Sequence, residues 1–127
     1  MGFFYISDDG TVDGAQPGDD VVVMVAGGEI DYAASPQLSE RLSERIDSGI
    51  RRVVLDMSTV TFIDSTAIGA LVSAATRLRE LGDGTLAVVC PEENRRIIRI
   101  FEIAGVDSVI AVHGSREGAI AELATVT

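Results

Sequence analysis

Short apolar runs alternate with amphipathic stretches along this chain, and this alternation constrains the fold more than any other feature. The runs at Val21–Ala26, Val53–Leu55 and Leu86–Cys90 are dominated by β-branched and other apolar residues, which predicts buried strands. Between them, apolar residues recur every three or four positions, which predicts helices. Strands separated by helices usually form a parallel sheet. We therefore expect an α/β fold.

Capping residues and glycines mark where the helices are expected to begin and end. Ser35 followed by Pro36 is a start signal, because a serine hydroxyl can cap free N–H groups and proline fits the first helical position. Glycine permits the left-handed backbone that stops a helix. On these signals four helices are expected to start at Ser35, at Ser65 or Thr66, at Pro91 with Glu92 and Glu93, and at Ser115, and the first three are expected to stop at Gly49, Gly82 and Gly105.

Two further strands and a long loop complete the expected fold. Phe3–Ile6 is predicted to be a short strand that pairs with Val21–Ala26, and Val109–Val112 is predicted to be the last strand. The acidic, glycine-rich stretch Asp8–Asp20 is predicted to be a loop, and Gly27-Gly28 a turn. Together these elements are expected to form a mostly parallel or mixed sheet of four to five strands, with about four helices packed on it.

Size and composition limit the class of protein. The 127 residues, 46% of them hydrophobic, are expected to form a single domain over residues 1–127 with a core that needs no metal or disulfide. The only cysteine, Cys90, cannot form an internal disulfide, and no export signal is recognisable, so a reducing cytoplasm is the expected location. No apolar run is long enough to predict a membrane span.

The chain carries a formal net charge of -10, from 20 acidic and 10 basic side chains. This charge disfavours direct binding to nucleic acids and to anionic membrane surfaces. The distribution is uneven, because acidic residues crowd the stretch Asp8–Asp20 whereas Arg95, Arg96 and Arg99 cluster late in the chain. Both clusters are interpreted as solvated surface.

The inventory of reactive side chains argues against an enzyme. His113 is the only histidine, with no nucleophile identifiable beside it, and is interpreted as a structural or surface residue. Cys90 ends an apolar strand, where a packed and unreactive thiol is expected. No spacing of cysteines and histidines indicates zinc, and no glycine motif for phosphates or dinucleotides is present. No cofactor and no metal are therefore expected.

The segment Val60–Gly69 stands out because an apolar stretch delivers one acid and two hydroxyls, Asp64, Ser65 and Thr66, to the start of a helix. Free N–H groups and the helix dipole create positive potential there, so a hydroxyl at this point could carry a phosphate. Alternatively, these side chains simply cap the helix. The residues alone leave both interpretations open.

Four short motifs occur in an order that resembles the STAS domains of bacterial anti-sigma-factor antagonists. They are Gly28-Glu29-Ile30-Asp31, Val53-Val54-Leu55-Asp56, Phe62-Ile63-Asp64-Ser65-Thr66 and Gly105-Val106. The resemblance runs from about Val21 to near the C-terminus, and the set is more specific than any single motif. It implies an α/β fold, in agreement with the alternation of strands and helices.

In that family, the serine directly after the aspartate is phosphorylated by a partner anti-sigma factor that is also a kinase using ATP. The resemblance therefore implies phosphorylation of Ser65, with Thr66 as the alternative, and a role for Asp31 and Asp64 in recognition or phosphotransfer. The alternative role of these two aspartates is hydrogen bonding in the turn and the cap. The family usually has glycine where this chain has Ala67, whose methyl group either restricts the approach of a partner or favours the helix. The implied partner-binding residues are Asp31, Asp64, Ser65, Thr66, Ala67 and Ile68.

The implied function is that of an anti-sigma-factor antagonist, which binds an anti-sigma factor, releases a sigma factor and is switched off by phosphorylation of Ser65. The alternative is a scaffold STAS domain in a stress-signalling assembly, whose binding does not depend on Ser65. An enzyme of flavodoxin-like architecture would require a cofactor or a clustered acid pocket. The sequence leaves open which partners are bound, what signal is sensed and whether the chain self-associates.

Overall fold

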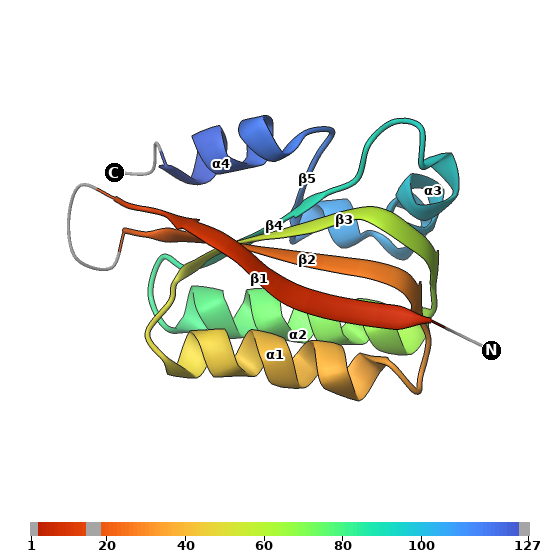
Figure 1. Cartoon of the computed structure of the whole chain (residues 1–127), viewed down its shortest axis with the longest axis horizontal. Coiled ribbons are helices and arrows are strands. Elements are labelled where there is room, and N and C mark those ends of the chain that lie inside the picture. Colours follow the sequence, from red (N-terminus) through yellow and green to blue (C-terminus); the bar gives the residue numbers. More distant parts are fainter. Residues whose placement is uncertain (1–2, 15–18, 125–127) are drawn as a thin grey trace.

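The computed structural model describes residues 3–14 and 19–124, and within them the five strands lie in one sheet in chain order, β1-β2-β3-β4-β5 (Figure 1). β1 is antiparallel to β2, and the other strands are parallel to one another. The expected α/β fold with a mixed sheet and four helices is therefore confirmed. The elements in order are β1 (Phe4–Val12), β2 (Val21–Ile30), α1 (Ser35–Asp47), β3 (Arg52–Ile63), α2 (Ser65–Glu80), β4 (Thr85–Val89), α3 (Arg95–Ala104), the 3-10 turn η1 (Val106–Ser108), β5 (Ala111–His113) and α4 (Arg116–Ala124).

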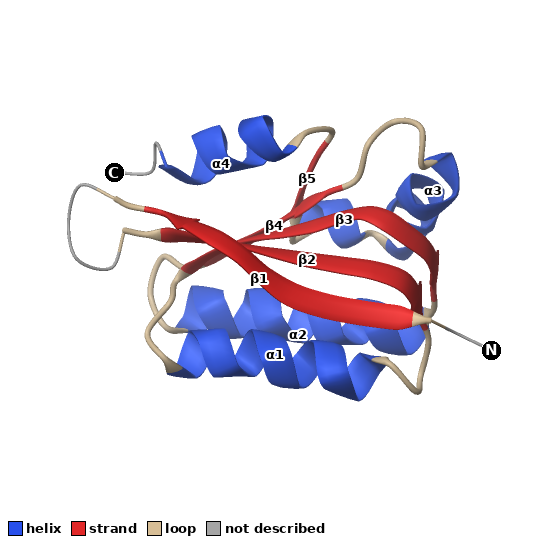
Figure 2. Cartoon of the chain, in the orientation of Figure 1, coloured by secondary structure: helices blue, strands red, loops and turns tan. Residues whose placement is uncertain are grey.

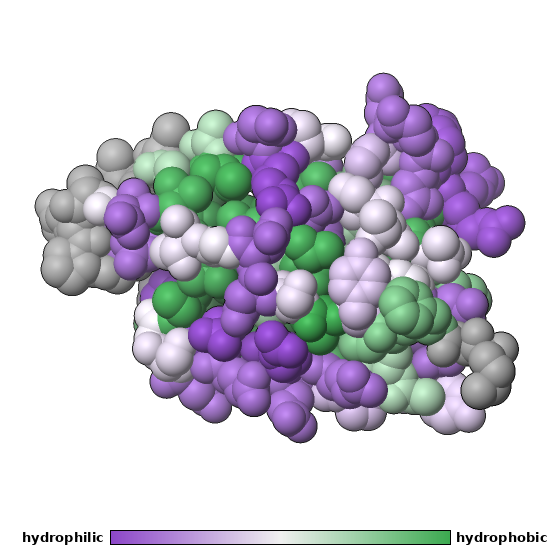
Figure 3. Space-filling view, viewed as in Figure 1, coloured by the Kyte–Doolittle hydropathy of each residue, from purple (hydrophilic) through white to green (hydrophobic). Residues whose placement is uncertain are grey.

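Different helices cover the two faces of the sheet (Figure 2). α1 and α2 lie side by side on one face, where Leu38 and Leu71 are fully buried in the larger apolar cluster, and α3 adds Ile97 to the same cluster. α4 packs Ala119 and Leu123 against the opposite face. The outer side of α1 is hydrophilic, which is seen as the purple lower margin in Figure 3. Each helix has one apolar and one polar side because its apolar side chains recur every three or four residues.

The first strand is longer than expected, so the prediction of a loop over Asp8–Asp20 is wrong at its start. β1 continues to Val12, and Asp8 and Thr11 pair with β2 across a register shift. Polar residues are compatible with this strand because its outer edge and much of its surface face solvent. Residues 15–18 of the expected loop lie outside the described residues. The predicted hairpin between the first two strands is confirmed.

Gly27 and Gly28 lie inside β2, so their prediction as a turn is wrong. The Tyr5 ring packs over Gly27, where a Cβ atom would stand 2.4 Å from ring carbons. Gly28 has a φ of 84°, and an added Cβ would meet the Phe3 carbonyl oxygen at 1.8 Å. The register between β2 and β3 shifts at this point. These glycines therefore allow an irregularity at which neighbouring strands approach closely.

Three element boundaries also differ from the predictions, one because of strand pairing and two because of local turns. β3 extends well beyond Val53–Leu55, since its second half pairs with β2. α3 begins at Arg95 instead of Pro91, because Pro91 to Asn94 forms a turn closed by the Asn94 N–H and the Pro91 carbonyl. β5 begins at Ala111 instead of Val109, because the preceding residues form η1.

Asp56, from one of the family motifs, joins α4 to the sheet. Its side chain is only 12% exposed and lies 2.8 Å from Arg116, which also contacts Asp9 of β1 at 2.5 Å. Burial raises the pKa of Asp56, but hydrogen bonds from Ser58 and Arg116 outweigh this effect and hold the pKa below its ordinary value of 3.8. The acidic residues on β1 therefore include ion-pair partners, and are not merely solvated as expected.

Candidate functional site

Two acidic turns meet at the carboxyl ends of β2 and β3, at the right-hand end of the view in Figure 1. The last residues of the two strands, Ile30 and Ile63, pair with each other in the parallel register. Asp31 and Asp64 follow them directly, and the Asp64 N–H donates to the Ile30 carbonyl at 3.3 Å. Parallel pairing therefore brings together two turns that are 33 positions apart in the sequence.

Asp64 caps the amino end of α2. Its Oδ1 accepts hydrogen bonds from the backbone N–H groups of Thr66 at 3.0 Å and Ala67 at 3.1 Å, and from the Thr66 hydroxyl at 2.6 Å. Desolvation raises the pKa of Asp64, but these hydrogen bonds and the Tyr32 N–H outweigh it and hold the pKa below its ordinary value of 3.8. The carboxylate is thus ionised at neutral pH.

This shift predicts how Asp64→Asn changes the dependence of stability on pH. The folded-state pKa lies below the unfolded one, so the ionised carboxylate contributes stability that is present above the unfolded value and is lost as the pH falls through the folded value. At pH 7 the free energy of unfolding of the variant is expected to lie within about 1 kcal/mol of that of the parent chain, because asparagine is also a good N-cap. Urea unfolding at a series of pH values from about 7 down to about 3 should give a flatter profile for the variant. If the stability of the two chains changed equally with pH, the result would contradict the capping role of Asp64.

Asp31 performs the corresponding task at the start of α1. Its Oδ1 accepts from the N–H groups of Ala33 and Ala34, each at 3.0 Å. The prediction that the Ser35 hydroxyl caps this helix is wrong, because that hydroxyl donates to the Asp31 carbonyl at 2.8 Å. It also lies 3.2 Å from the Thr66 hydroxyl oxygen, and so connects the starts of α1 and α2.

The two candidate phosphorylation residues differ in how their hydroxyls are engaged. Thr66 is exposed, but its hydroxyl donates to Asp64 and lies against Ser35. Ser65 is the first residue of α2 and is exposed, and within the described residues its hydroxyl makes no hydrogen bond. Because a free hydroxyl is open to modification without loss of a contact, the geometry favours Ser65 over Thr66.

The next two residues of the predicted partner-binding set point largely inward. Ala67 is 0% exposed and belongs to the core, and Ile68 is partly buried against it. The Ala67 methyl group therefore does not stand between Ser65 and an approaching protein. Of the two effects considered for this alanine, the structure favours the effect on the helix.

A shallow groove of about 350 Å³ runs between the first turns of α1 and α2. Tyr32 and Thr66 line its end nearest the site, and Ser39 and Ser73 continue it along the helices. Tyr32 is 74% exposed, and sequence reasoning missed it. The available signal was an aromatic residue immediately after Asp31, in a turn where polar residues are the usual choice.

The other candidate reactive residues lie away from this edge. His113 Nε2 contacts Glu122 of α4 at 2.5 Å. Cys90 is 2% exposed, and burial raises the pKa of its thiol to about 11. Both observations agree with the predicted packed and unreactive thiol. Within the described residues no helix is both long and apolar enough to cross a membrane, and no cluster of potential metal ligands occurs.

Comparison with known proteins assigns the chain to a family. The STAS domain model matches residues 15–119. The chain belongs to the STAS domain family. Among its relatives, BtrV of Bordetella bronchiseptica, provisionally named an anti-sigma factor antagonist, is 34% identical over 84% of this chain and 90% of its own length. The anti-sigma-B factor antagonist of Bacillus subtilis is 31% identical over 86% of this chain and 95% of its own.

Solved structures share the same STAS fold. An anti-sigma factor antagonist from Mycobacterium paratuberculosis superposes with a TM-score of 0.74 at 22% identity, covering 94% of both chains. SpoIIAA in its unphosphorylated form gives 0.73 at 18% identity, covering 97% of this chain and 99% of its own. SpoIIAA of Bacillus in its phosphorylated form gives a TM-score of 0.62 at 18% identity, covering 94% of this chain and 99% of its own. At these identities the likeness establishes the fold.

Proposed function

We propose that this STAS chain is an anti-sigma-factor antagonist that binds an anti-sigma factor, thereby releasing a sigma factor, and that phosphorylation of Ser65 switches it off. The observation that carries the proposal is the exposed Ser65 hydroxyl, free of hydrogen bonds within the described residues, at the amino end of α2. The names of the relatives support the general role. The phosphorylated form of SpoIIAA supports the switch.

The proposed partner is an anti-sigma factor that is also a serine kinase using ATP, and the proposed location is the cytoplasm. In the transfer, the Ser65 oxygen forms a bond to the γ-phosphorus of ATP as the bond to the β–γ bridging oxygen breaks. ADP leaves, and the hydroxyl proton passes to a base on the kinase. This chain is the substrate of that reaction and not the enzyme.

The proposed contact surface is the edge built by Asp31, Asp64, Ser65 and Thr66, extended by the exposed ring of Tyr32. A phosphate on Ser65 adds roughly -1.5 to -2 charges beside two carboxylates. Ser65 is exposed, and the dipole of α2 favours negative charge at this end of the helix, so the fold persists. The added charge weakens the binding of a partner that is complementary to the unmodified surface, through repulsion and desolvation.

Phosphotransfer is tested by incubating the full chain with candidate kinase-type anti-sigma factors and magnesium ATP, followed by peptide mass spectrometry. One phosphate on Ser65 is expected. Ser65→Ala should abolish its incorporation, whereas Thr66→Val should retain it. A phosphate on Thr66 in the parent chain would contradict the site. Stable self-association, with partner binding unaffected by both variants, would support the scaffold alternative instead.

A further inference from the structure

One edge of β3 is open over the second half of the strand. β4 pairs only with Arg52 to Asp56, whereas β3 continues to Ile63. On its other side this second half pairs with β2. Within residues 3–14 and 19–124, no strand borders Met57–Ile63 on the side of β4. An open strand edge presents backbone groups that another extended chain can pair with.

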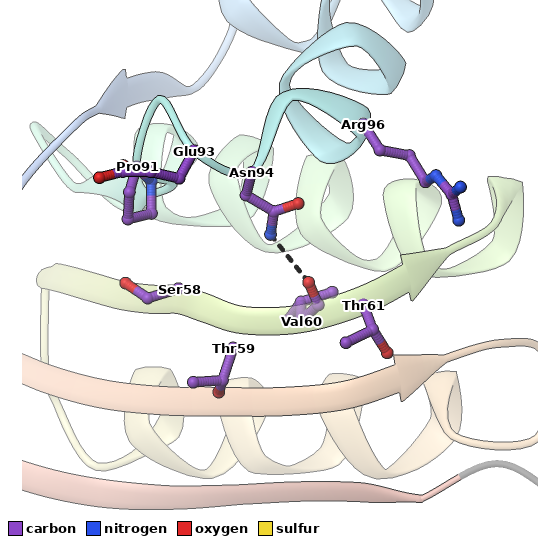
Figure 4. A pocket seen from close by; sticks show the side chains of 8 residues that line it. All are labelled: Ser58, Thr59, Val60, Thr61, Pro91, Glu93, Asn94 and Arg96. Atoms are coloured by element: carbon purple, nitrogen blue, oxygen red, sulfur yellow. Dashed lines mark hydrogen bonds between the residues drawn. The ribbon is translucent and has the colours of Figure 1, made fainter.

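A groove of about 540 Å³ runs along this open edge (Figure 4). Ser58, Thr59 and Thr61 line it from β3, and the turn before α3 faces them from the other side. Arg96 of α3 lies near the Thr61 end, and Glu93 lies nearer the Ser58 end. The groove therefore has a cationic end and an anionic end.

Asn94 bridges the groove and occupies one position on the open edge. Its Nδ2 donates to the Val60 carbonyl at 2.8 Å, although its place before α3 would suit it to cap that helix. The side chain makes no cap hydrogen bond. It thus supplies to β3 one hydrogen bond of the kind that a neighbouring strand would donate.

The arginines of α3, one of which is Arg96 in the groove, have no ion-pair partner within the described residues. The chain has no lysine, so all 10 basic side chains are arginines. Three of these, Arg95, Arg96 and Arg99, are exposed on α3, and within the described residues they make no ion pair or hydrogen bond. The other arginines are all engaged: Arg41, Arg45, Arg52, Arg77 and Arg116 with carboxylates, and Arg51 and Arg79 with backbone carbonyls. Exposed acidic residues, Glu93 and Glu102, lie on the same segment, so the free positive charge in the groove is that of Arg96 at one end.

We infer that this groove binds an extended acidic segment of a partner protein, which adds as a strand to the open edge of β3. The free edge selects an extended backbone, and Arg96 of α3 selects a carboxylate at the Thr61 end. The bound segment replaces the Asn94 side chain at the Val60 carbonyl. This inference goes beyond the Ser65 switch and does not rest on it, because the groove lies along the side of β3 that faces α3, whereas Ser65 follows the carboxyl end of the strand.

The charge requirement is tested with a fluorescent eight-residue peptide of alternating glutamate and valine, added to the full chain while anisotropy is recorded. Saturable binding is expected, and Arg96→Glu should weaken it by about tenfold or more. Arg77→Glu makes the same change of net charge on α2 and should leave the affinity within about twofold. Absence of saturable binding, or equal losses in the two variants, would overturn the inference.

The strand-pairing requirement is tested with a second peptide that carries proline at alternate positions, because proline cannot donate to a ladder. Its binding should be lost, and Asn94→Ala should bind the original peptide at least as tightly as the parent chain does. Equal binding of the proline peptide would overturn strand addition. Tighter binding of a lysine-valine peptide, or displacement of the acidic peptide by a single-stranded oligonucleotide, would overturn the choice of an acidic protein segment.

Discussion

Replacing Ser65 with glutamate is expected to weaken binding to the anti-sigma factor by about 30-fold or more, which corresponds to about 2 kcal/mol. The new carboxylate would stand at an exposed position beside Asp31 and Asp64, on the edge proposed to dock. It would not disturb the core, and an acid in the first turn of α2 is compatible with the helix dipole. Titration calorimetry would measure the affinity, and circular dichroism would show an unchanged fold.

Two variants separate the effect of position from the effect of charge. Ser65→Ala removes the hydroxyl without adding charge and should retain binding. Thr76→Glu adds the same charge at an exposed position on α2, about 16 Å further along the helix, and should change the affinity by less than about threefold. An affinity of Ser65→Glu equal to that of the parent chain would contradict the proposed switch.

Gly28→Ala is expected to destabilise the fold by about 3 kcal/mol and to lower Tm by roughly 10 °C. The backbone at Gly28 has a φ of 84°, which residues with a side chain rarely adopt, and the new Cβ would lie 1.8 Å from the Phe3 carbonyl oxygen. The Glu29 N–H donates to that same carbonyl at 2.7 Å, so the backbone cannot shift without loss of a strand contact. Thermal and urea unfolding would measure the loss.

Two other glycines provide matched controls for this substitution. Gly10 also has a positive φ, 117°, but nothing lies within 4 Å of an added Cβ, so Gly10→Ala should cost only about 1 kcal/mol. Gly69 lies within α2 with open space around it, so Gly69→Ala should be neutral or stabilising by up to about 1 kcal/mol. Equal losses at Gly28 and Gly10 would show that the contact with Phe3 contributes nothing.

Local patterns were sufficient to predict the order of strands and helices, because apolar spacing and glycine stops act within a few residues. They failed where the partner of a segment is distant in sequence. The strand character of Asp8 to Val12 depends on pairing with β2, and the late start of α3 depends on the turn that places Asn94 against Val60. Neither contact leaves a trace in the residues nearby.

The candidate site was predicted only as far as its motifs reach. The position of Ser65 at the start of α2 follows from the hydroxyls and acid that precede an apolar helix pattern. The preference for Ser65 over Thr66 follows from the structure alone, because it depends on which hydroxyl already contacts Asp64 and Ser35. Tyr32 was missed because nothing in the sequence shows that its turn lies beside another one.

The parallel strands are added in a single direction, each beyond the one before. Open α/β sheets that enclose cofactors do so in the crevice that forms where the winding reverses and adjacent loops part. The described sheet contains no such reversal, and the Ser35–Thr66 contact keeps the loops after β2 and β3 together. The turns after β2 and β3 therefore form one continuous surface, on which a contact at one helix start is transmitted directly to the other.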